Sequence, residues 1–293
     1  MNWKKLRYRL EASMLWLPLT LFRLLGLDRA NDMSGKLFKS AGPRLGISRR
    51  AHKNIRHAMP ELAPGDVERI VEGMWDNLGR TISEYAFLEN FAKPEYASRI
   101  ELQGVEVLKD IRSRGKGGLF VSGHFANWEL MPLVMQQHGY EGGGVYRHAN
   151  NPYVNDWMVN LRARATGAVQ IPKGAAGARQ IVKLLRDNKF IAMLVDQKMN
   201  DGIETLFFNQ PAMTTAAPAG LAVRYGAPLI PAHFIRKGGS HFVLRVYEPI
   251  YAREGADPFE EIARLTQALN DFLEARIREH PSQWLWVHNR WKK

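Results

Sequence analysis

Apolar and polar positions alternate in two ways along this chain, and each way predicts a different kind of element. Short apolar runs bounded by glycine or polar residues are typical of strands. The runs at residues 119–121 and 190–195 are apolar throughout, as expected of strands that are buried on both faces. Similar runs predict further strands at residues 144–146, 169–172, 229–235 and 241–247. The last two are expected to pair through a Gly-rich turn.

Between these runs, apolar residues recur at spacings of three and four, which predicts amphipathic helices. Pro64 and Asp66 open a long helix that is expected to continue to about residue 90. A helix is also expected to begin at Asn127. Further helices are predicted at residues 51–60, 105–114, 152–165, 175–188, 213–225 and 257–280. This alternation indicates an α/β fold in which helices flank a largely parallel central sheet.

The N-terminal segment combines an apolar run with an excess of basic residues. Residues 14–27 are strongly apolar, but Pro18 and Arg23 interrupt them, and the run is shorter than the roughly 20 residues of a membrane span. We interpret residues 1–30 as a membrane-anchoring helix, either interfacial or marginally spanning, ahead of a single α/β domain at residues 31–293. An ordinary core helix is the alternative.

The charge of the chain is concentrated in the same segment. Residues 1–60 hold 13 Lys and Arg against Glu11, Asp28 and Asp32, a balance of +10, whereas the whole chain carries +12. Such a patch suits an anionic membrane surface or a nucleic acid. The neighbouring apolar run favours the membrane, so we expect anionic lipid and no nucleic acid as a partner.

A histidine lies where the strand at residues 119–121 ends and a helix is about to begin. Gly123 lets the backbone turn before His124, and Asn127 can cap the helix with Glu129 in its first turn. Glu129 is near enough in sequence to face the imidazole. Because a carboxylate that orients a histidine is the usual arrangement of a general base, we expect His124 to act as the base and Glu129 as its partner.

Polar residues also follow two other predicted strands. Because the carboxyl ends of parallel strands meet at one edge of a sheet, these side chains are expected to form one site with His124. Taken singly, each has an ordinary structural explanation, such as a solvated loop arginine or an aspartate that caps a turn. Together with Asn127, the residues that we expect to bind substrate are Tyr146, Arg147, Asn150, Asp196 and Gln197.

The sequence excludes several chemistries. The absence of cysteine excludes disulfides, thiolate metal sites and a cysteine nucleophile. There is no Gly-x-Ser-x-Gly elbow, no dinucleotide or P-loop pattern, and no paired metal-ligand spacing of histidines, so we expect neither a cofactor nor a metal. A histidine base, a carboxylate and Arg147 suit direct attack of a hydroxyl on an activated acyl group. Arg147 would offset charge on the tetrahedral oxygen or hold a phosphate.

Residues 123–129, Gly-His-Phe-Ala-Asn-Trp-Glu, resemble the His-x4-Glu motif of the bacterial lipid A late acyltransferases, the lauroyl and myristoyl transferases. The resemblance covers nearly the whole chain in order. It continues through Tyr146-Arg147, Asn150-Asn151-Pro152, Asp196-Gln197, Phe207-Phe208, Pro211-Ala212, Thr214, residues 228–231 and residues 284–292. It implies an enzyme on the cytoplasmic face of the bacterial inner membrane. Its reaction would transfer an acyl chain from acyl carrier protein to a hydroxyl of a 3-hydroxyacyl chain on a lipid A precursor, with His124 as base.

Two further interpretations stay open. Glycerol-phosphate acyltransferases usually carry His-x4-Asp, so Glu129 favours the lipid A branch, but the acceptor of this fold can also be a lysophospholipid or a glycolipid. The second interpretation is a non-enzymatic basic protein of the membrane surface, in which His124 is a core residue. The sequence leaves open the acyl chain length, the acceptor hydroxyl, acyl carrier protein against coenzyme A as donor, and the oligomeric state.

Overall fold

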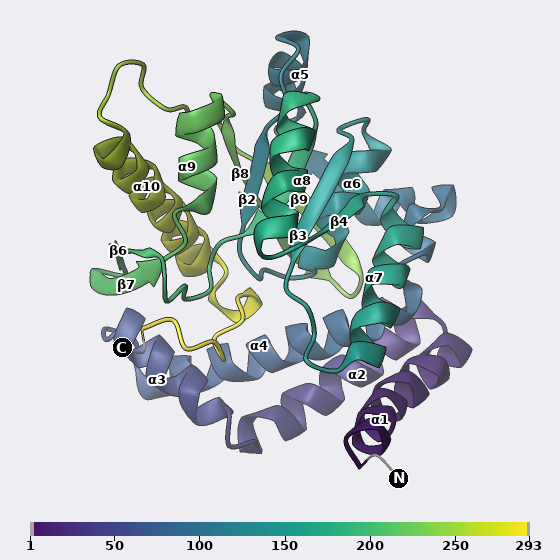
Figure 1. The fold of residues 1–293 in the computed structure, drawn as a ribbon. Coiled ribbons are helices and arrows are strands. Elements are labelled where there is room, and N and C mark those ends of the chain that lie inside the picture. Colours follow the sequence, from purple (N-terminus) through teal and green to yellow (C-terminus); the bar gives the residue numbers. More distant parts are fainter. Residues whose placement is uncertain (1–2, 292–293) are drawn as a thin grey trace.

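A computed structural model describes residues 3–291 and contains a seven-stranded sheet between layers of helices (Figure 1). The strand order is β1-β9-β8-β2-β5-β3-β4, and every neighbouring pair is parallel except β8 and β9. The predicted α/β class with a mostly parallel sheet is therefore confirmed. The strands are β1 (Ile100–Gln103), β2 (Leu119–Ser122), β3 (Gly142–Tyr146), β4 (Val169–Pro172), β5 (Phe190–Leu194), β8 (Leu229–Gly238) and β9 (His241–Val246).

The central strands β2 and β5 are buried on both faces, as their apolar sequences predict. Alternate side chains of β2 enter two different cores: Leu119 and Val121 pack on one side of the sheet and Phe120 on the other. Helices cover both faces, and most of their bounds lie near the predicted ranges. They are α3 (Ser48–Ala58), α4 (Pro64–Glu84), α5 (Val105–Ser113), α6 (Met131–Gln137), α7 (Pro152–Thr166), α8 (Ala175–Arg186), α9 (Ala217–Tyr225) and α10 (Pro258–Glu279). However, α4 ends at Glu84 instead of near residue 90, and the α-helix expected from Asn127 begins only at Met131, after a 3-10 turn.

A two-stranded hairpin, β6 (Ile203–Phe207) and β7 (Gln210–Thr214), replaces the start of one predicted helix. Met213 and Thr214 belong to β7, and α9 begins only at Ala217. The turn between these strands contains no glycine that would predict it from the sequence. Its two residues with positive φ are Phe208 and Asn209. The edge strand β1 was missed too, since it has only four residues and none is buried.

Two helices form the N-terminal segment, α1 (Trp3–Leu25) and α2 (Leu27–Ala41), so the predicted boundary at residue 30 falls inside α2. Helix α2 lies along α4, where Ser34 Oγ donates a hydrogen bond of 2.7 Å to the carbonyl of Gly79. A side chain at Gly79 would collide with Phe38 and the Ser34 carbonyl, so glycine permits this close approach. No helix within residues 3–291 is long and apolar enough to cross a membrane. The anchoring role of this segment therefore stays a prediction.

The Trp-rich end of the chain is part of the core. Trp284 and Trp286 are at most 1% exposed, and residues 281–291 run between α10 and the helices α3 and α4 (Figure 1). Asn54 of α3 donates hydrogen bonds of 2.7 and 2.6 Å to the carbonyls of Trp286 and His288. These contacts fix the last described residues beside the carboxyl ends of the central strands.

Candidate active site

The register of the two central strands places His124 beside Asp196. Ser122 of β2 pairs with Leu194 of β5, and each strand is followed two residues later by one member of this pair. His124 Nδ1 lies 2.8 Å from Asp196 Oδ1, while Asp196 Oδ2 accepts a hydrogen bond of 2.8 Å from the backbone N–H of His124. A Cβ at Gly123 would come within 3.0 Å of the same carboxylate, which explains the glycine before the histidine.

Asp196 is fully buried, and both of its carboxylate oxygens accept hydrogen bonds. Its Oδ2 also accepts a hydrogen bond of 2.8 Å from the indole Nε1 of Trp284. Burial alone would raise the pKa of the Asp196 carboxyl, but the neighbouring charge of His124 and the hydrogen bonds from its ring and backbone hold that pKa well below its usual range. Asp196 is thus a carboxylate at neutral pH, and a carboxylate facing Nδ1 favours the His124 tautomer with its proton on that nitrogen.

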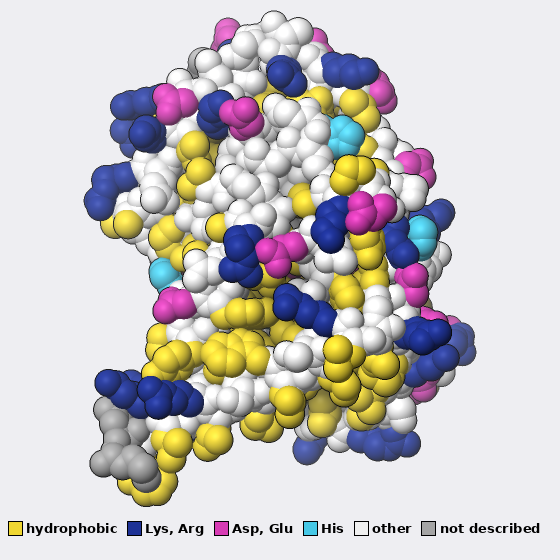
Figure 2. Space-filling model, turned by 90° about the vertical axis from the view of Figure 1, so that its right-hand side faces the viewer, with side chains coloured by type: hydrophobic (Ala, Val, Ile, Leu, Met, Phe, Trp, Pro, Cys, Tyr) yellow, Lys and Arg dark blue, Asp and Glu magenta, His cyan; other side chains and the backbone are white. Residues whose placement is uncertain are grey.

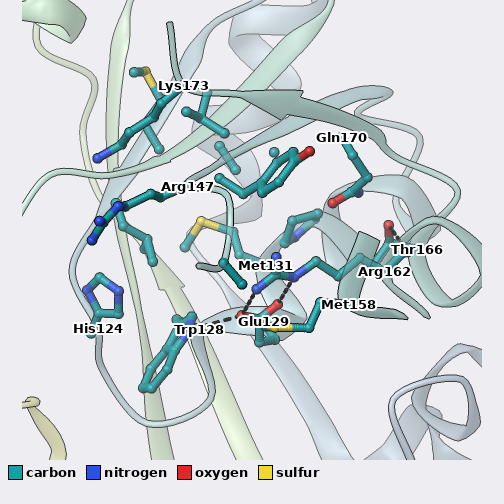
Figure 3. Close-up of a pocket in the computed structure, with 18 of the residues that line it drawn as sticks. His124, Trp128, Glu129, Met131, Arg147, Met158, Arg162, Thr166, Gln170 and Lys173 are labelled. Carbon is teal, nitrogen blue, oxygen red and sulfur yellow. Dashed lines mark hydrogen bonds and ion pairs between the residues drawn. The ribbon is translucent and has the colours of Figure 1, made fainter. Parts of the chain in front are cut away.

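Glu129 does not form the expected pair with His124. Its Oε2 accepts from Arg162 Nε and its Oε1 from Arg162 Nη2, both at 2.6 Å, and Tyr85 donates its hydroxyl to Oε1 at 2.7 Å. A 3-10 turn, Trp128–Leu130, turns Glu129 away from His124 and toward α7, as Figure 3 shows. The sequence-based pairing is corrected accordingly: Asp196 orients His124, and Glu129 binds Arg162.

The Glu129–Arg162 pair is a closed unit of opposite charges. Burial alone would raise the pKa of Glu129, but the Arg162 charge and its hydrogen bonds lower it. The same carboxylate raises the pKa of Arg162 above its usual value, against the effect of burial. Burial and the Glu129 charge raise the pKa of Tyr85 well above its usual range, so its hydroxyl keeps its proton. None of the three groups is placed to exchange a proton near neutral pH.

A cavity of about 290 Å³ opens beside His124 and extends between β3, β5, α6 and α7. Much of its wall is apolar, including Met131, Pro132, Val145, Met158 and Met193. In Figure 3, His124, Arg147 and Lys173 lie on one side of the cavity and Arg162, Thr166 and Gln170 on the other. The arrangement suits a ligand with a long apolar chain and a reactive polar end near His124.

Two cations at the His124 side have no ion-pair partner among residues 3–291. They are Arg147, which follows β3, and Lys173, which follows β4 (Figure 3). Unpaired cations in a cavity wall attract anionic groups such as phosphates or a developing oxyanion. Lys173 was not predicted from the sequence, because a lysine after a strand carries no signal of its own.

The other predicted binding residues separate into two groups. Tyr146, Arg147 and Gln197 line the cavity, as expected of substrate-binding residues. Asp196 lies behind His124, and the exposed Asn150 is not part of the cavity wall. Asn127 is 1% exposed and also lies outside the wall. The loops that carry these residues meet at one edge of the sheet, as expected, but three of the side chains lie outside the cavity wall. Their contact with substrate stays a prediction.

Asn127 instead holds the loop that carries His124. Its Oδ1 accepts from the backbone N–H of Glu129 at 3.1 Å, as predicted for a cap, and its Nδ2 donates to Glu84 at 2.8 Å. Glu84 of α4 is fully buried and ion-paired with Arg236 of β8. The loop also contains Ala126 with φ of 45°, a conformation that is costly for a residue with a side chain. Fixing it therefore needs this network of buried hydrogen bonds.

One group of side chains within residues 3–291 has the spacing of metal ligands, and it lies outside the cavity. It consists of His233, Glu279 and His280. Glu279 is already ion-paired with Arg276 at 2.9 Å. Positive charge from Arg276 acts on both histidines and, after burial, helps to lower their pKa values. The same positive charge opposes binding of a cation, so this group supports no metal centre.

A known protein family matches almost the whole chain. The family described as bacterial lipid A biosynthesis acyltransferases matches residues 2–293. The chain belongs to this family. The acyltransferase resemblance carried by the His-x4-Glu segment is thereby confirmed, and the chain is an enzyme of an acyltransferase family. This acyltransferase is 26% identical over 256 residues to the lipid A biosynthesis lauroyltransferase of Escherichia coli K12, covering 84% of the chain and 80% of the relative.

Further relatives of this acyltransferase differ in the acceptor that their names state. The lipid A biosynthesis myristoyltransferase of Escherichia coli K12 is 24% identical over 264 residues, which cover 89% of the chain and 78% of the relative. The phosphatidylinositol mannoside acyltransferase of Mycobacterium tuberculosis H37Rv is also 24% identical, over 191 residues that cover 64% of the chain and 58% of the relative. Relatives named for a lipid A acceptor and for a mannoside acceptor thus share this sequence pattern.

Several residues of the site were missed or left without a role by sequence reasoning. Arg162 and Tyr85 lie on or beside helices and have no local signal, because a partner for a buried glutamate can come from any neighbouring element. Trp284 and His288 stood in the closing motif that carries the family resemblance. Their contacts with the His124 region become visible only in the fold.

Proposed function

We propose that this acyltransferase moves a fatty acyl chain from acyl carrier protein to a hydroxyl of a 3-hydroxyacyl chain on a lipid A precursor. The observation that carries the proposal is His124, bound through Nδ1 to a buried carboxylate and lying in the wall of a largely apolar cavity. An imidazole with its proton on Nδ1 leaves a lone pair on Nε2, which a hydroxyl proton can reach.

In the proposed reaction, Nε2 of His124 removes the proton of the acceptor hydroxyl. At the same time the hydroxyl oxygen attacks the thioester carbonyl carbon. Asp196 stabilises the imidazolium that forms. The tetrahedral intermediate collapses, the carbon–sulfur bond breaks, and His124 returns the proton to the departing thiolate. Acyl transfer is direct, because the chain has no cysteine and no serine elbow for a covalent intermediate.

Arg147 and Lys173 supply positive charge where the reaction needs it. Both line the cavity on the side of His124 and neither has an ion-pair partner within residues 3–291. We assign Arg147 to the oxyanion or to a phosphate of a substrate, and Lys173 to a phosphate. Glu129 acts here through Arg162: their ion pair forms part of the cavity wall, so Glu129 positions the site and takes no proton.

The acyl chain occupies the apolar part of the cavity in this proposal. Methionines and the ring of Pro132 line it, and burying each methylene group of a chain there stabilises the complex by about 0.8 kcal/mol. Flexible thioether side chains adapt to an alkyl chain without leaving gaps. Binding through the chain also explains how one catalytic arrangement serves acceptors with different head groups.

The N-terminal helix is assigned to the cytoplasmic surface of the inner membrane. One face of α1 packs on the protein through Ala12, Leu19 and Phe22. Arg23, the charged residue within the apolar run, donates from Nε to the carbonyl of Ala86 at 3.0 Å and therefore points toward the protein. The opposite face exposes apolar side chains at helical spacing, in the lower part of the molecule in Figure 2; they are Trp3, Leu10, Met14, Leu17, Leu21 and Leu24.

This face fits an interfacial helix better than a spanning one. A helix that lies in the membrane surface presents one apolar face to lipid and keeps the other on its own protein. Basic residues of the first 60 positions then meet anionic head groups. Exchanging Leu10, Leu17 and Leu24 for Asn should abolish flotation with vesicles that contain anionic phospholipid. The same exchange at Leu206 and Phe259, which are exposed elsewhere, should leave flotation intact. Equal flotation of both variants would refute the assignment.

A glycolipid acceptor is the second candidate, and the match to phosphatidylinositol mannoside acyltransferases favours it over a lysophospholipid. The purified enzyme, supplied with acyl carrier protein that bears a radiolabelled acyl chain, separates the two candidates. We expect label in a lipid A precursor and not in a mannosylated phosphatidylinositol. Label only in the mannoside would overturn the proposed acceptor while leaving the mechanism in place. Mass spectrometry of the lipid A from a deletion strain should show the loss of one acyl chain.

A further inference from the structure

A glutamine joins two imidazoles beside the cavity. The side-chain Nε2 of Gln197 lies 3.3 Å from Nε2 of His124 and 3.2 Å from Nε2 of His288, and the centroids of the two imidazole rings are 5.0 Å apart. We propose that Gln197 and His288 are positioning residues that hold His124 in the tautomer able to accept a proton. This inference rests on the proposed role of His124 as the base.

The donor and acceptor pattern of the cluster leads to one arrangement of protons. Asp196 accepts from Nδ1 of His124, so a neutral His124 carries its proton there and offers a lone pair at Nε2. An amide NH2 group has two hydrogens and can donate one to each imidazole. If the Gln197 amide were flipped, its oxygen would face the lone pair on Nε2 of His124, and two acceptors would meet without a hydrogen between them. The network is therefore satisfied when Gln197 donates to both histidines and both have their protons on Nδ1.

His288 is held firmly enough to serve as the fixed end of this bridge. Its own carbonyl accepts from Asn54, and the carbonyl of Val287 accepts from Arg50 at 3.1 Å. Burial, followed by the nearby charges of His124 and Arg50, lowers the pKa of His288 to about 4. His288 is therefore neutral at physiological pH and keeps the lone pair that the Gln197 amide needs.

The bridge occupies the position on His124 that the acceptor hydroxyl must reach. Before substrate binds, the Gln197 amide holds the ring against rotation and saturates its Nε2. An arriving hydroxyl replaces that one hydrogen bond, while the second bond to His288 keeps the amide nearby. The acceptor therefore meets an imidazole that is already oriented, which is the arrangement that lowers the cost of reaching the transition state.

Exchanging Gln197 for Glu tests the donor role with almost no change in shape. A carboxylate between the two imidazoles favours their protonated forms. The charged and ionisable groups that face His124 are then this new carboxylate, Asp196, His288 and, on the same side of the cavity, Arg147 and Lys173. Because protonated His124 cannot act as a base, the acidic limb of the kcat/KM profile should move to higher pH by about 1 to 3 units. Gln180→Glu, the same change on the exposed surface of α8, should leave the profile in place.

Exchanges of His288 test the fixed end of the bridge. His288→Phe keeps an aromatic ring but removes the acceptor, and it should lower kcat/KM about 5- to 10-fold, the value of one hydrogen bond. His288→Asn restores an acceptor oxygen and should recover part of the loss. Thermal unfolding of each variant shows whether it is folded before its rate is compared.

Nitrogen NMR of the imidazoles gives a readout that needs no substrate. With ¹⁵N-labelled histidine, the neutral forms of His124 and His288 in the wild-type protein should show protons on Nδ1 and free Nε2. Gln197→Glu should protonate His124 at a pH where the wild type is neutral. A proton on Nε2 of His124 in the wild type, or an unchanged titration and pH profile in Gln197→Glu, would overturn the inference. Failure of the proposed acceptor would leave these NMR results as predicted, so the two proposals can fail separately.

Discussion

Two buried carboxylates lie at the cavity, and their partners differ in one chemical property. Asp196 binds the imidazole of His124, whereas Glu129 binds the guanidinium of Arg162. Both carboxyl pKa values are lowered by these contacts. A histidine gains and loses a proton near neutral pH, but an arginine keeps its proton throughout that range. Asp196, beside a histidine, can therefore support proton transfer. Glu129 and Arg162 instead form a permanent ion pair with no net charge in the cavity wall.

Removing the titrating partner should have the largest effect. His124→Ala takes away the group proposed to accept the acceptor's proton, so the transfer rate should fall by about 10²- to 10⁴-fold. The protein should stay folded, because the side chain is not part of a hydrophobic core cluster. Radiolabelled acyl transfer measures the rate and thermal unfolding the stability. His138→Ala, an exposed histidine at the end of α6, is the matched control and should behave as the wild type. A His124 variant with normal turnover would end the proposed mechanism.

The same isosteric change at the two carboxylates should then separate their roles. Asp196→Asn places an amide opposite His124 Nδ1 and favours the wrong tautomer, and a comparable change in a serine protease triad costs about 10⁴ in kcat. We expect a loss of about 10²- to 10⁴-fold in kcat, with KM for the acyl donor little changed. If Asp196→Asn were as active as Glu129→Gln, the distinction between the two carboxylates would not hold.

Glu129→Gln should mainly reduce stability. It leaves Arg162, whose side chain is 17% exposed, without its counter-ion, which costs up to about 3–5 kcal/mol in the free energy of unfolding. The fraction that stays folded should show a pH profile of the wild-type shape, because Glu129 exchanges no proton. Replacing Arg162 by Met as well removes the uncompensated charge, so the double variant should be more stable than Glu129→Gln. Urea unfolding of the three proteins measures this, and a double variant less stable than the single one would argue against a structural ion pair.

The smallest effect concerns the second histidine near Asp196. The pKa of His288 is lowered to about 4, below the value of about 6.5 in an unfolded chain. As the pH falls below about 6.5, His288 becomes protonated in the unfolded state, whereas in the folded state it stays neutral until about pH 4. The free energy of unfolding should therefore fall by up to about 1.4 kcal/mol per pH unit across this window. His288→Phe should have a shallower slope there, and exchange of the exposed His138 should not alter it.

The difference between the two carboxylates also shows what the sequence could predict. The strand that ends before His124, the cap at Asn127 and most helices follow from local patterns of apolar and polar residues. The pairing of His124 with Asp196 does not follow from such patterns. Asp196 lies 72 positions after His124 and approaches it only through the pairing of β2 with β5. Glu129 was the carboxylate nearest in sequence, but the backbone turn after Asn127 points it toward α7.

Further misses have the same physical origin. The β6–β7 hairpin turns through Phe208 and Asn209 at positive φ, and this pair is not a usual hairpin-turn sequence. In α1, the apolar run was recognised, but its division into a packed face and an exposed face depends on what lies beneath the helix. Local sequence patterns predict that a helix or strand forms. Which part of the protein packs against each of its faces depends on the rest of the fold.

The contacts that complete the His124 loop come from a distant part of the chain. The carbonyl of Gln283 accepts from the backbone N–H of Ala126 at 3.0 Å, and Trp284 donates its indole N–H to Asp196. During synthesis at about 5–20 residues per second, the loop waits roughly 10 to 30 seconds after His124 is made before these partners exist. A nascent chain that already contains the whole sheet thus still lacks a finished site.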